Sequence, residues 1–289
     1  MKQVLLILLI ALVALIAWLC VPFNILVIGV DAYANQPTEG SRSDGLIVIR
    51  VIPYLAQIKM ISIPRDTYVE IPCENYKQDK ITHSHHFGGT QCTIDAVENL
   101  LDTKINYHVR FRFEDVMNIT NLIDGVDVVA NHTFNQDYFD QEVFHFNQGQ
   151  VYNLRGRMAL AYTRHRKSDT AFKRDERQRQ VIQGIVRKIA EPSGWKYIPQ
   201  VYGYTKEHME IAVNPIKSLS ALPAVLIHHS DIEQYEITGD GRMINGVWYF
   251  IPDEVSLENA SIIFRYQMIS AGHRIIKKYK YKMSRVKDH

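Results

Sequence analysis

Two aspartates each lie where an apolar stretch of the sequence meets a polar loop. Asp31 follows the apolar run that ends in Gly29-Val30, and Asp44 follows Arg42-Ser43 just before the next apolar run. Proteins of the α/β class carry reactive groups at such strand-to-loop junctions. Two converging carboxylates could hold one hard divalent cation such as Mg²⁺, which prefers oxygen ligands and keeps several waters. On spacing alone, each aspartate could instead cap a turn.

An arginine and an aspartate close the third apolar stretch, in Ser62-Ile-Pro-Arg65-Asp66. The proline ends the predicted strand and presents Arg65 beside Asp66. An arginine that is braced by a neighbouring carboxylate can fork onto two oxygens of a phosphate group. The alternative is a surface ion pair, which contributes only ~0–1 kcal/mol to folding.

The densest positive charge lies between residues 155 and 188, where eleven Lys and Arg face three Asp and Glu. The side chains of interest there are Arg164, Arg166, Arg174, Arg177 and Gln178. The spacing of the last three places them on one helical face. Arginine suits bidentate capture of phosphate oxygens, whereas the alternative is a solvated helix face. A formal net charge of only +2 and the lack of a recognisable binding motif argue against nucleic acid as a partner.

Three histidines lie close together in Lys80-Ile-Thr-His83-Ser-His85-His86-Phe-Gly88-Gly89. This density raises the possibility of zinc. The spacing matches no standard zinc site, however, and no companion Cys or Glu is in register. We therefore expect a Gly-Gly turn whose polar groups line a cleft.

Predicted strands alternate with predicted helices along the chain. Apolar runs predict strands at 23–30, 46–51, 57–63, 126–129 and 247–251. Helical periodicity predicts helices at 93–101, with Thr93 as N-cap, and at 113–123, 154–163, 174–190 and 216–228. This alternation predicts an α/β fold, a three-layer α/β/α domain around a central mixed sheet.

The N-terminus carries an apolar run without charge from Val4 to Val21. As a helix it reaches roughly 27 Å, close to the ~30 Å hydrocarbon core of a bilayer. Its end is a poor cleavage site, and Trp18 suits a membrane interface. We therefore predict a retained anchor over residues 1–22, with a cleaved signal as the alternative. Lys2 favours a cytoplasmic N-terminus, which places the remaining chain outside the cytoplasm.

The composition, 46% hydrophobic and 22% charged, is that of a globular protein and excludes wholesale disorder.

Cys73 and Cys92 could form a disulfide in an oxidising compartment, or remain two buried thiols. The segment His273–Lys287 contains no acidic residue. It is a solvated tail or a contact to anionic lipid or polymer. We accordingly divide the chain into the anchor, one domain over residues 23–265 and a basic tail over 266–289.

Taken together, these segments resemble the LytR-CpsA-Psr (LCP) family. The motifs that carry the resemblance are Gly29-Val-Asp31, Arg42-Ser-Asp44, Ser62-Ile-Pro-Arg65-Asp66, Lys80 to Gly89, Arg164-His-Arg166 and Arg174 to Gln178. They occur in the order of the family and span about residues 23–260. The set is specific, although any one motif alone would be weak.

The resemblance implies a membrane-anchored transferase whose catalytic domain lies outside the cytoplasm. Members move a glycopolymer of the teichoic-acid or capsule type from a polyprenyl-pyrophosphate carrier to peptidoglycan, and release polyprenyl phosphate. By resemblance, Asp31 and Asp44 bind Mg²⁺, or Mn²⁺, at the pyrophosphate, and an apolar tunnel in the core holds the lipid tail. The side chains expected along the pyrophosphate are Arg42, Arg65, Lys80, Arg164, Arg166, Arg174 and Gln178. The catalytic group would be Asp44, Arg42 and Asp66, with Asp44 or Asp66 deprotonating the acceptor hydroxyl.

Some positions depart from the family pattern. Thr82 stands where Asn is usual, and Thr170–Lys173 replaces an acidic-Asp-Phe-Gly run. Cys73 and Cys92 flank the histidine-rich segment and are expected to brace a variant acceptor groove. Two other functions remain open: a polyprenyl-pyrophosphate hydrolase, in which water attacks, and a non-catalytic lipid-pyrophosphate binder or regulator of envelope assembly.

Overall fold

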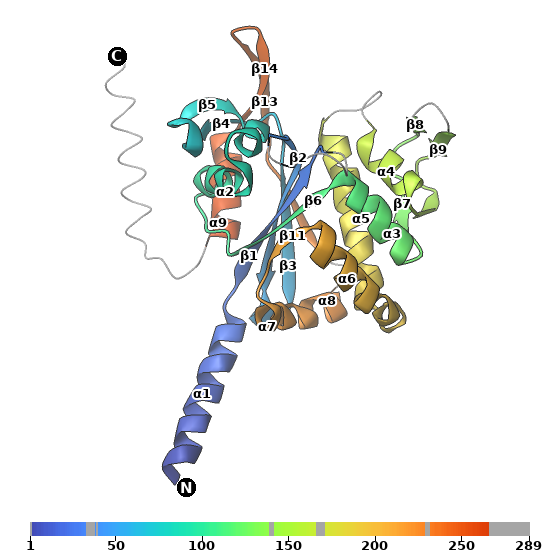
Figure 1. The fold of residues 1–289 in the computed structure, drawn as a ribbon. Coiled ribbons are helices and arrows are strands. Elements are labelled where there is room, and N and C mark those ends of the chain that lie inside the picture. Colours follow the sequence, from blue (N-terminus) through green and yellow to red (C-terminus); the bar gives the residue numbers. More distant parts are fainter. Residues whose placement is uncertain are drawn as a thin grey trace, which may run out of the picture.

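An apolar helix extends from an α/β domain (Figure 1). The computed structural model describes residues 2–32, 38, 40–138, 142–165, 171–228 and 232–265. Within these ranges, α1 (Lys2–Cys20) is the one helix long and apolar enough to cross a membrane, and none of its residues is buried. This is consistent with the predicted anchor. The predicted basic tail lies outside the described residues.

The domain is built on a mixed six-stranded sheet with the strand order β11-β6-β1-β2-β3-β12. Its strands are β1 (Phe23–Val30), β2 (Ser43–Ile52), β3 (Gln57–Ile63), β6 (Tyr107–Arg112), β11 (Glu210–Ala212) and β12 (Glu233–Glu236). β1 runs antiparallel to β2, with Gly29 opposite Gly45, and parallel to β6. The C-terminal end of β1 and the N-terminal end of β2 therefore lie side by side at one end of the strands, which brings Asp31 and Asp44 together.

Helices cover both faces of this sheet (Figure 1). α2 (Thr82–Leu101) and α9 (Glu254–Phe264) pack on one face, where Val48 of β2 belongs to their apolar cluster. α5 (Ala171–Ala190) and α8 (Leu222–His228) pack on the other face, against Ile47. Neighbouring residues of a strand point to opposite faces, so the continuous apolar run of β2 serves both layers. The three-layer α/β/α prediction is confirmed.

A second apolar cluster lies beside the sheet, under α3 (Phe113–Leu122), α4 (Arg157–Arg164) and α6 (Ile198–His208). The described residues also form four two-stranded sheets: β4 (Tyr68–Ile71) with β5 (Lys77–Lys80), β7 (Val126–Val129) with β10 (Val151–Leu154), β8 (Phe134–Tyr138) with β9 (Glu142–Phe146), and β13 (Gly239–Ile244) with β14 (Val247–Pro252). Short helical segments are η1 (Pro53–Leu55), η2 (Pro72–Glu74), η3 (Pro192–Tyr197), α7 (Pro215–Ser218) and η4 (Leu219–Ala221).

The predicted helix at 93–101 begins eleven residues earlier than expected. α2 starts at Thr82 and bends at Gly88 and Gly89, where Gly89 has a φ of +62° and a ψ of −151°. Only glycine adopts that conformation readily, so the predicted Gly-Gly turn is confirmed as a break inside the helix. Thr93 is therefore not an N-cap. It lies inside the helix, where its hydroxyl donates to the carbonyl of Gly89 at 3.0 Å.

Two other helix predictions were wrong in extent. The predicted helix at 154–163 begins three residues too early, because Leu154 ends β10 and α4 spans Arg157–Arg164. The predicted helix at 216–228 consists of α7, η4 and α8. Pro223 lies in the first turn of α8, where its missing N–H costs no hydrogen bond; inside one continuous helix it would remove one.

Cys73 and Cys92 form a disulfide between η2 and α2. Of the two alternatives, a disulfide or two buried thiols, the first is therefore confirmed. The bridge packs against the bend of α2. A Cβ atom at Gly88 would lie 2.6 Å from Cβ of Cys92 and 2.8 Å from Sγ of Cys73. The bend therefore requires glycine at this position, and the disulfide fixes the β4–β5 hairpin region to α2.

We expect the double substitution Cys73→Ala/Cys92→Ala to lower the free energy of unfolding by about 3 kcal/mol. The crosslink joins residues 19 positions apart, and such a loop removes that much entropy from the unfolded chain. Urea unfolding of the full chain in detergent measures the change, with Cys20→Ser as the matched control at the exposed free cysteine. An unchanged unfolding midpoint for the double variant would show that the bridge is dispensable.

Candidate functional site

A polar pocket of about 230 Å³ opens at the sheet edge where β1 ends and β2 begins. Its lining residues come from five segments of the chain: Asp31, Asp44, Phe113, Thr163, Arg164, Arg174 and Gln178. Five of these seven were predicted as site residues. Phe113 and Thr163 were not, because neither is charged and neither shares a predicted helical face with the arginines, as Gln178 does.

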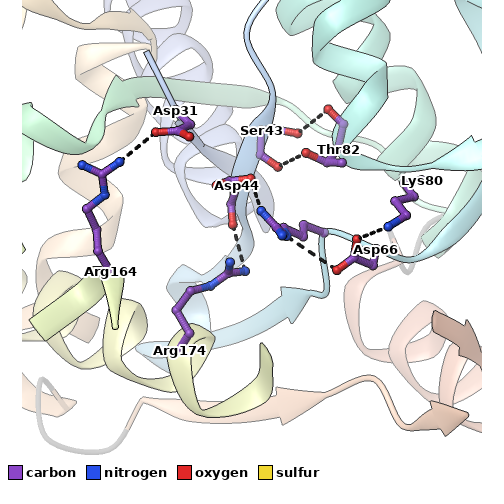
Figure 2. Close-up of polar contacts among 9 residues, drawn as sticks. Asp31, Ser43, Asp44, Asp66, Lys80, Thr82, Arg164 and Arg174 are labelled. Carbon is purple, nitrogen blue, oxygen red and sulfur yellow. Dashed lines mark hydrogen bonds and ion pairs between the residues drawn. The ribbon is translucent and has the colours of Figure 1, made fainter. Parts of the chain in front are cut away.

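The two aspartates of the pocket each meet an arginine (Figure 2). Arg164, in the last turn of α4, donates from Nη2 to Oδ1 of Asp31 at 3.0 Å. Arg65 donates from Nη1 to Oδ1 of Asp44 at 2.8 Å. Arg174, in the first turns of α5, donates from Nη2 to the main-chain oxygen of Asp44 at 3.2 Å. Opposite charges thus hold one another in place, at a site where additional negative charge would be attracted by three guanidinium groups.

Arg65, Asp66 and Lys80 form a chain of charges next to the pocket. Figure 2 shows Asp66 and Lys80 pointing toward each other. Asp66 contacts Nζ of Lys80 at 2.7 Å and Nε of Arg65 at 3.5 Å. Burial lowers the pKa of Arg65, but Asp44 and Asp66 outweigh it and leave the pKa above its ordinary value. Arg65 therefore stays charged and is held on two sides, which fixes the direction of its remaining donors.

Thr82 joins the histidine-rich segment to the strand that carries Asp44 (Figure 2). Its hydroxyl donates to the main-chain oxygen of Ser43 at 2.8 Å, and its N–H donates to the carbonyl of Arg65 at 3.1 Å. Thr82 is buried, so these bonds are shielded from water. Thr82 stands where the family usually has Asn, but it is also a hydrogen-bonding side chain. Its bonds align two motifs of the site.

The three histidines of that segment contact separate partners. His83 lies 2.8 Å from Oδ2 of Asp79, His85 lies 3.0 Å from the carbonyl of Ser41, and His86 lies 2.5 Å from the carbonyl of Gly40. Within the described ranges no three His, Cys, Asp or Glu side chains are grouped so that they could hold a metal ion. The structure therefore gives the zinc alternative no geometric support.

Arg177 stabilises the fold and does not line the pocket. Its side chain is fully buried, donates to the carbonyls of Tyr162 at 2.9 Å and His165 at 2.8 Å, and lies over the ring of Phe134. The predicted residue Arg42 is exposed and is not among the lining residues. Arg166 lies outside the described residues. Helical spacing alone could not show that Arg174 lines the pocket and Arg177 does not. The difference arises because Arg177 meets main-chain carbonyls at the end of α4.

A narrow apolar cavity of about 20 Å³ lies deeper in the domain, between the sheet and the helices α3 and α5. Its walls include Val27, Ile47, Phe111, Val116, Val181 and Ile182. It shares Phe113, Thr163 and Gln178 with the polar pocket. A ligand with a charged head and an apolar tail could therefore occupy both, with its head at the sheet edge.

Gly45 keeps the boundary between the two cavities open. A Cβ atom at this position would lie 2.9 Å from Oε1 of Gln178, which is itself buried. We expect Gly45→Ala to displace Gln178 and to reduce turnover by up to roughly 10²-fold, the cost that a misplacement of about 1 Å can have for a substrate-positioning group.

Gly203→Ala is the matched control, since a Cβ atom there meets no atom within 4 Å. The steric origin is tested in a Gln178→Ala background, where Gly45→Ala should cost nothing more. If Gly45→Ala alone leaves steady-state turnover unchanged, Gln178 does not set the width of this boundary.

The carboxylates of Asp31 and Asp44 suit a hard cation. Mg²⁺ is commonly held by one or two carboxylates together with the phosphate oxygens of a substrate, and the pocket offers that number. The arginines beside them would repel a bare cation, but they would attract the phosphate oxygens of a ligand that brings the cation with it. The residues present therefore fit Mg²⁺ bound together with a phosphorylated ligand.

The chain belongs to the LytR_cpsA_psr family, whose model matches residues 20–263. The resemblance seen in the motifs is thereby confirmed. The match covers every described segment that contributes to the pocket.

Individual relatives agree with this assignment. A polyisoprenyl-teichoic acid–peptidoglycan teichoic acid transferase, TagU of Bacillus licheniformis, is 36% identical over 240 residues, which are 82% of this chain and 75% of that protein. The crystal structure of B. subtilis TagV superposes with a TM-score of 0.74 at 30% identity, over 85% of this chain and 96% of that one. A structure of TagT bound to LIIa-WTA superposes with a TM-score of 0.69 at 26% identity, over 84% and 89%.

Proposed function

We propose that this chain is a phosphotransferase that moves a glycopolymer from a polyprenyl-pyrophosphate carrier to a hydroxyl of a peptidoglycan-type acceptor. The observation that carries the proposal is the charged pocket that shares Phe113, Thr163 and Gln178 with an apolar cavity. The relatives support it, because they are named as transferases that join teichoic acid to peptidoglycan.

The two cavities match the two ends of the donor. A pyrophosphate in the polar pocket would meet the guanidinium groups of Arg164 and Arg174, with Arg65 beside them. The first isoprene units would enter the apolar cavity next to Phe113. That cavity is narrow, so lining side chains must move as the lipid enters.

The reaction requires one bond exchange at phosphorus. The acceptor oxygen attacks the phosphorus that carries the glycan, and the bond from this phosphorus to the bridging oxygen breaks. Polyprenyl phosphate leaves with the bonding electrons, and the hydroxyl proton passes to Asp44 or Asp66. Such reactions depend on positioning and on neutralising charge at the non-bridging oxygens, which the arginines supply here.

Asp31 and Asp44 are the residues that we propose hold Mg²⁺, or Mn²⁺. The ion would neutralise charge on the pyrophosphate. Binding of Mn²⁺ in the presence of inorganic pyrophosphate, followed by electron paramagnetic resonance, should be lost in Asp31→Asn and kept in Glu258→Gln, an exposed acidic residue of α9. Equal binding by both variants would refute this metal site.

We also propose that α1 crosses the membrane with its N-terminus in the cytoplasm and the domain outside. The Cys73–Cys92 disulfide supports this, because such bonds persist in oxidising compartments. The proposed acceptor, a cell-wall polymer, lies on the same side.

The test uses the full chain in proteoliposomes with a short polyprenyl-pyrophosphate oligosaccharide, peptidoglycan fragments and Mg²⁺. Mass spectrometry should detect the coupled product together with polyprenyl phosphate. Polyprenyl phosphate with uncoupled oligosaccharide phosphate would identify a hydrolase instead. Tight donor binding without either product would leave only a binding protein.

A further inference from the structure

We infer that the end of the domain from which α1 leaves is a membrane-docking face, whose partner is the interfacial layer of a lipid bilayer. Figure 1 shows α7 and α8 beside the domain end of α1. The face is formed by η1, α7, η4 and α8, and its exposed apolar side chains are Tyr54, Leu55, Ile216, Leu219 and Leu222. The inference rests on α1 as a membrane anchor and not on the proposed transferase activity.

The exposure pattern of this segment is the inverse of that of a water-facing helix. Lys217 is only 3% exposed, whereas Ile216 is 56%, Leu219 60% and Leu222 47% exposed. Ala224 of α8 is buried against the sheet, so the segment does have a normal inner side. Contiguous exposed apolar residues beside a buried charge mark a surface that meets something other than water.

Lys217 is buried because it caps the anchor helix. Its Nζ donates three hydrogen bonds, to the carbonyls of Trp18 at 2.5 Å, Leu19 at 3.1 Å and Val21 at 2.7 Å. The ammonium group also lies 5.1 Å from the centre of the Trp18 ring. The last carbonyls of a helix lack partners within the helix and carry partial negative charge, so a cation there is favourable. This contact fixes α7 to the last turn of α1.

That attachment sets the height of the face. The 19 residues of α1 span about 28 Å, close to the ~30 Å hydrocarbon core, so Trp18 lies at the interface. Only Val21 and Pro22 separate α1 from β1. Segments bound to the carbonyls of residues 18–21 therefore lie in the headgroup layer, where apolar side chains gain by entering the acyl boundary.

η1 belongs to the same level. It packs against both α1 and α8, and Tyr54 and Leu55 at its tip are exposed. Two segments far apart in the sequence thus present apolar side chains around the point where the anchor enters the membrane. A second copy of the chain is the other conceivable cover, but the bilayer is already present at this height for every molecule that is anchored by α1.

A spin-label experiment tests the inference on the full chain. A nitroxide is attached to Leu219→Cys in a Cys20→Ser background, and the protein is reconstituted in phosphatidylcholine vesicles containing phosphatidylglycerol. The matched control is Met243→Cys, at a residue that is 62% exposed. Met243 belongs to β13, whose hairpin with β14 lies at the end of the domain opposite α1 (Figure 1). Power saturation compares collisions with oxygen, which partitions into lipid, and with a water-soluble nickel chelate.

At position 219 we expect oxygen collisions to exceed chelate collisions several-fold, with the order reversed at position 243. Water-like accessibility at both positions would overturn the inference. Low accessibility to both reagents at 219, with dipolar broadening between labels, would also overturn it and would assign the face to a second copy of the chain.

Discussion

Replacing Asp44 with Asn is expected to lower the rate of polymer transfer by about 10³-fold, the scale found when one preorganised electrostatic contact is removed from a reacting centre. Asp44 holds Arg65 at 2.8 Å, lines the polar pocket and is buried. The substitution removes the charge but keeps the shape. The donor should still bind within about tenfold of the parent affinity, because the arginines that meet the pyrophosphate remain.

The measurement is kcat from coupled-product formation, alongside the Kd for the polyprenyl-pyrophosphate donor. Glu258→Gln removes an equal charge from an exposed position on α9 and should change neither value. Full turnover of Asp44→Asn would remove this residue from the mechanism. A parallel collapse of donor binding would instead give it a role in binding alone.

Arg174→Lys should reduce kcat/KM by about 10²- to 10³-fold although the positive charge is kept. Arg174 is buried, and its guanidinium donates to the main-chain oxygen of Asp44 while it lines the pocket. A planar guanidinium can hold that oxygen and reach phosphate oxygens at once, whereas an ammonium is a point charge on a shorter reach. The loss corresponds to ~2.7–4 kcal/mol of transition-state stabilisation.

Arg155→Lys serves as the comparison, since Arg155 forms an exposed ion pair with Asp124 at 3.3 Å. Such pairs contribute little, so this variant should behave as the parent chain. Thermal unfolding of both variants separates catalysis from folding. If Arg174→Lys retains kcat/KM, charge alone is sufficient at this position.

The strands of the sheet core could be predicted closely because their signal is local. β1, β2 and β3 are continuous apolar runs, and burial on both faces is what such runs indicate. The first part of α2 escaped prediction because its buried residues, including Thr82, Ser84 and His85, are polar. Their burial depends on hydrogen bonds to distant segments, and such residues do not contribute to hydrophobic periodicity.

The residues of the site were predictable by type, but their assembly was not. Asp31 and Arg164 are 133 positions apart, and Asp31 reaches Asp44 only through the register that sets Gly29 opposite Gly45. Strand register is a tertiary property, so spacing could suggest a cation or phosphate site without placing the arginines around it. The structural role of Arg177 could not be predicted for the same reason, because its partners are main-chain carbonyls of neighbouring segments.

The apolar face at the anchor shows the reverse error. Residues 216–228 were predicted as one helix from their apolar periodicity, which assumes that apolar side chains point inward. In the structure Ile216 and Leu219 point outward and Lys217 inward, because the carbonyls at the end of α1 attract the lysine. Periodicity identifies an apolar side of a helix, but it does not show whether that side faces the core or the outside of the domain.

The fate of isotopic oxygen distinguishes attack by the acceptor hydroxyl from attack by water. Transfer is run in H₂¹⁸O with the polyprenyl-pyrophosphate oligosaccharide, unlabelled peptidoglycan fragments and Mg²⁺, and both products are weighed by mass spectrometry. We expect polyprenyl monophosphate and a phosphodiester-linked product, both free of ¹⁸O, because the attacking oxygen comes from the acceptor. Oligosaccharide phosphate carrying one ¹⁸O would show that water attacks instead. Release of polyprenyl pyrophosphate would place the attack on the sugar carbon, and either result would contradict the proposed phosphotransfer.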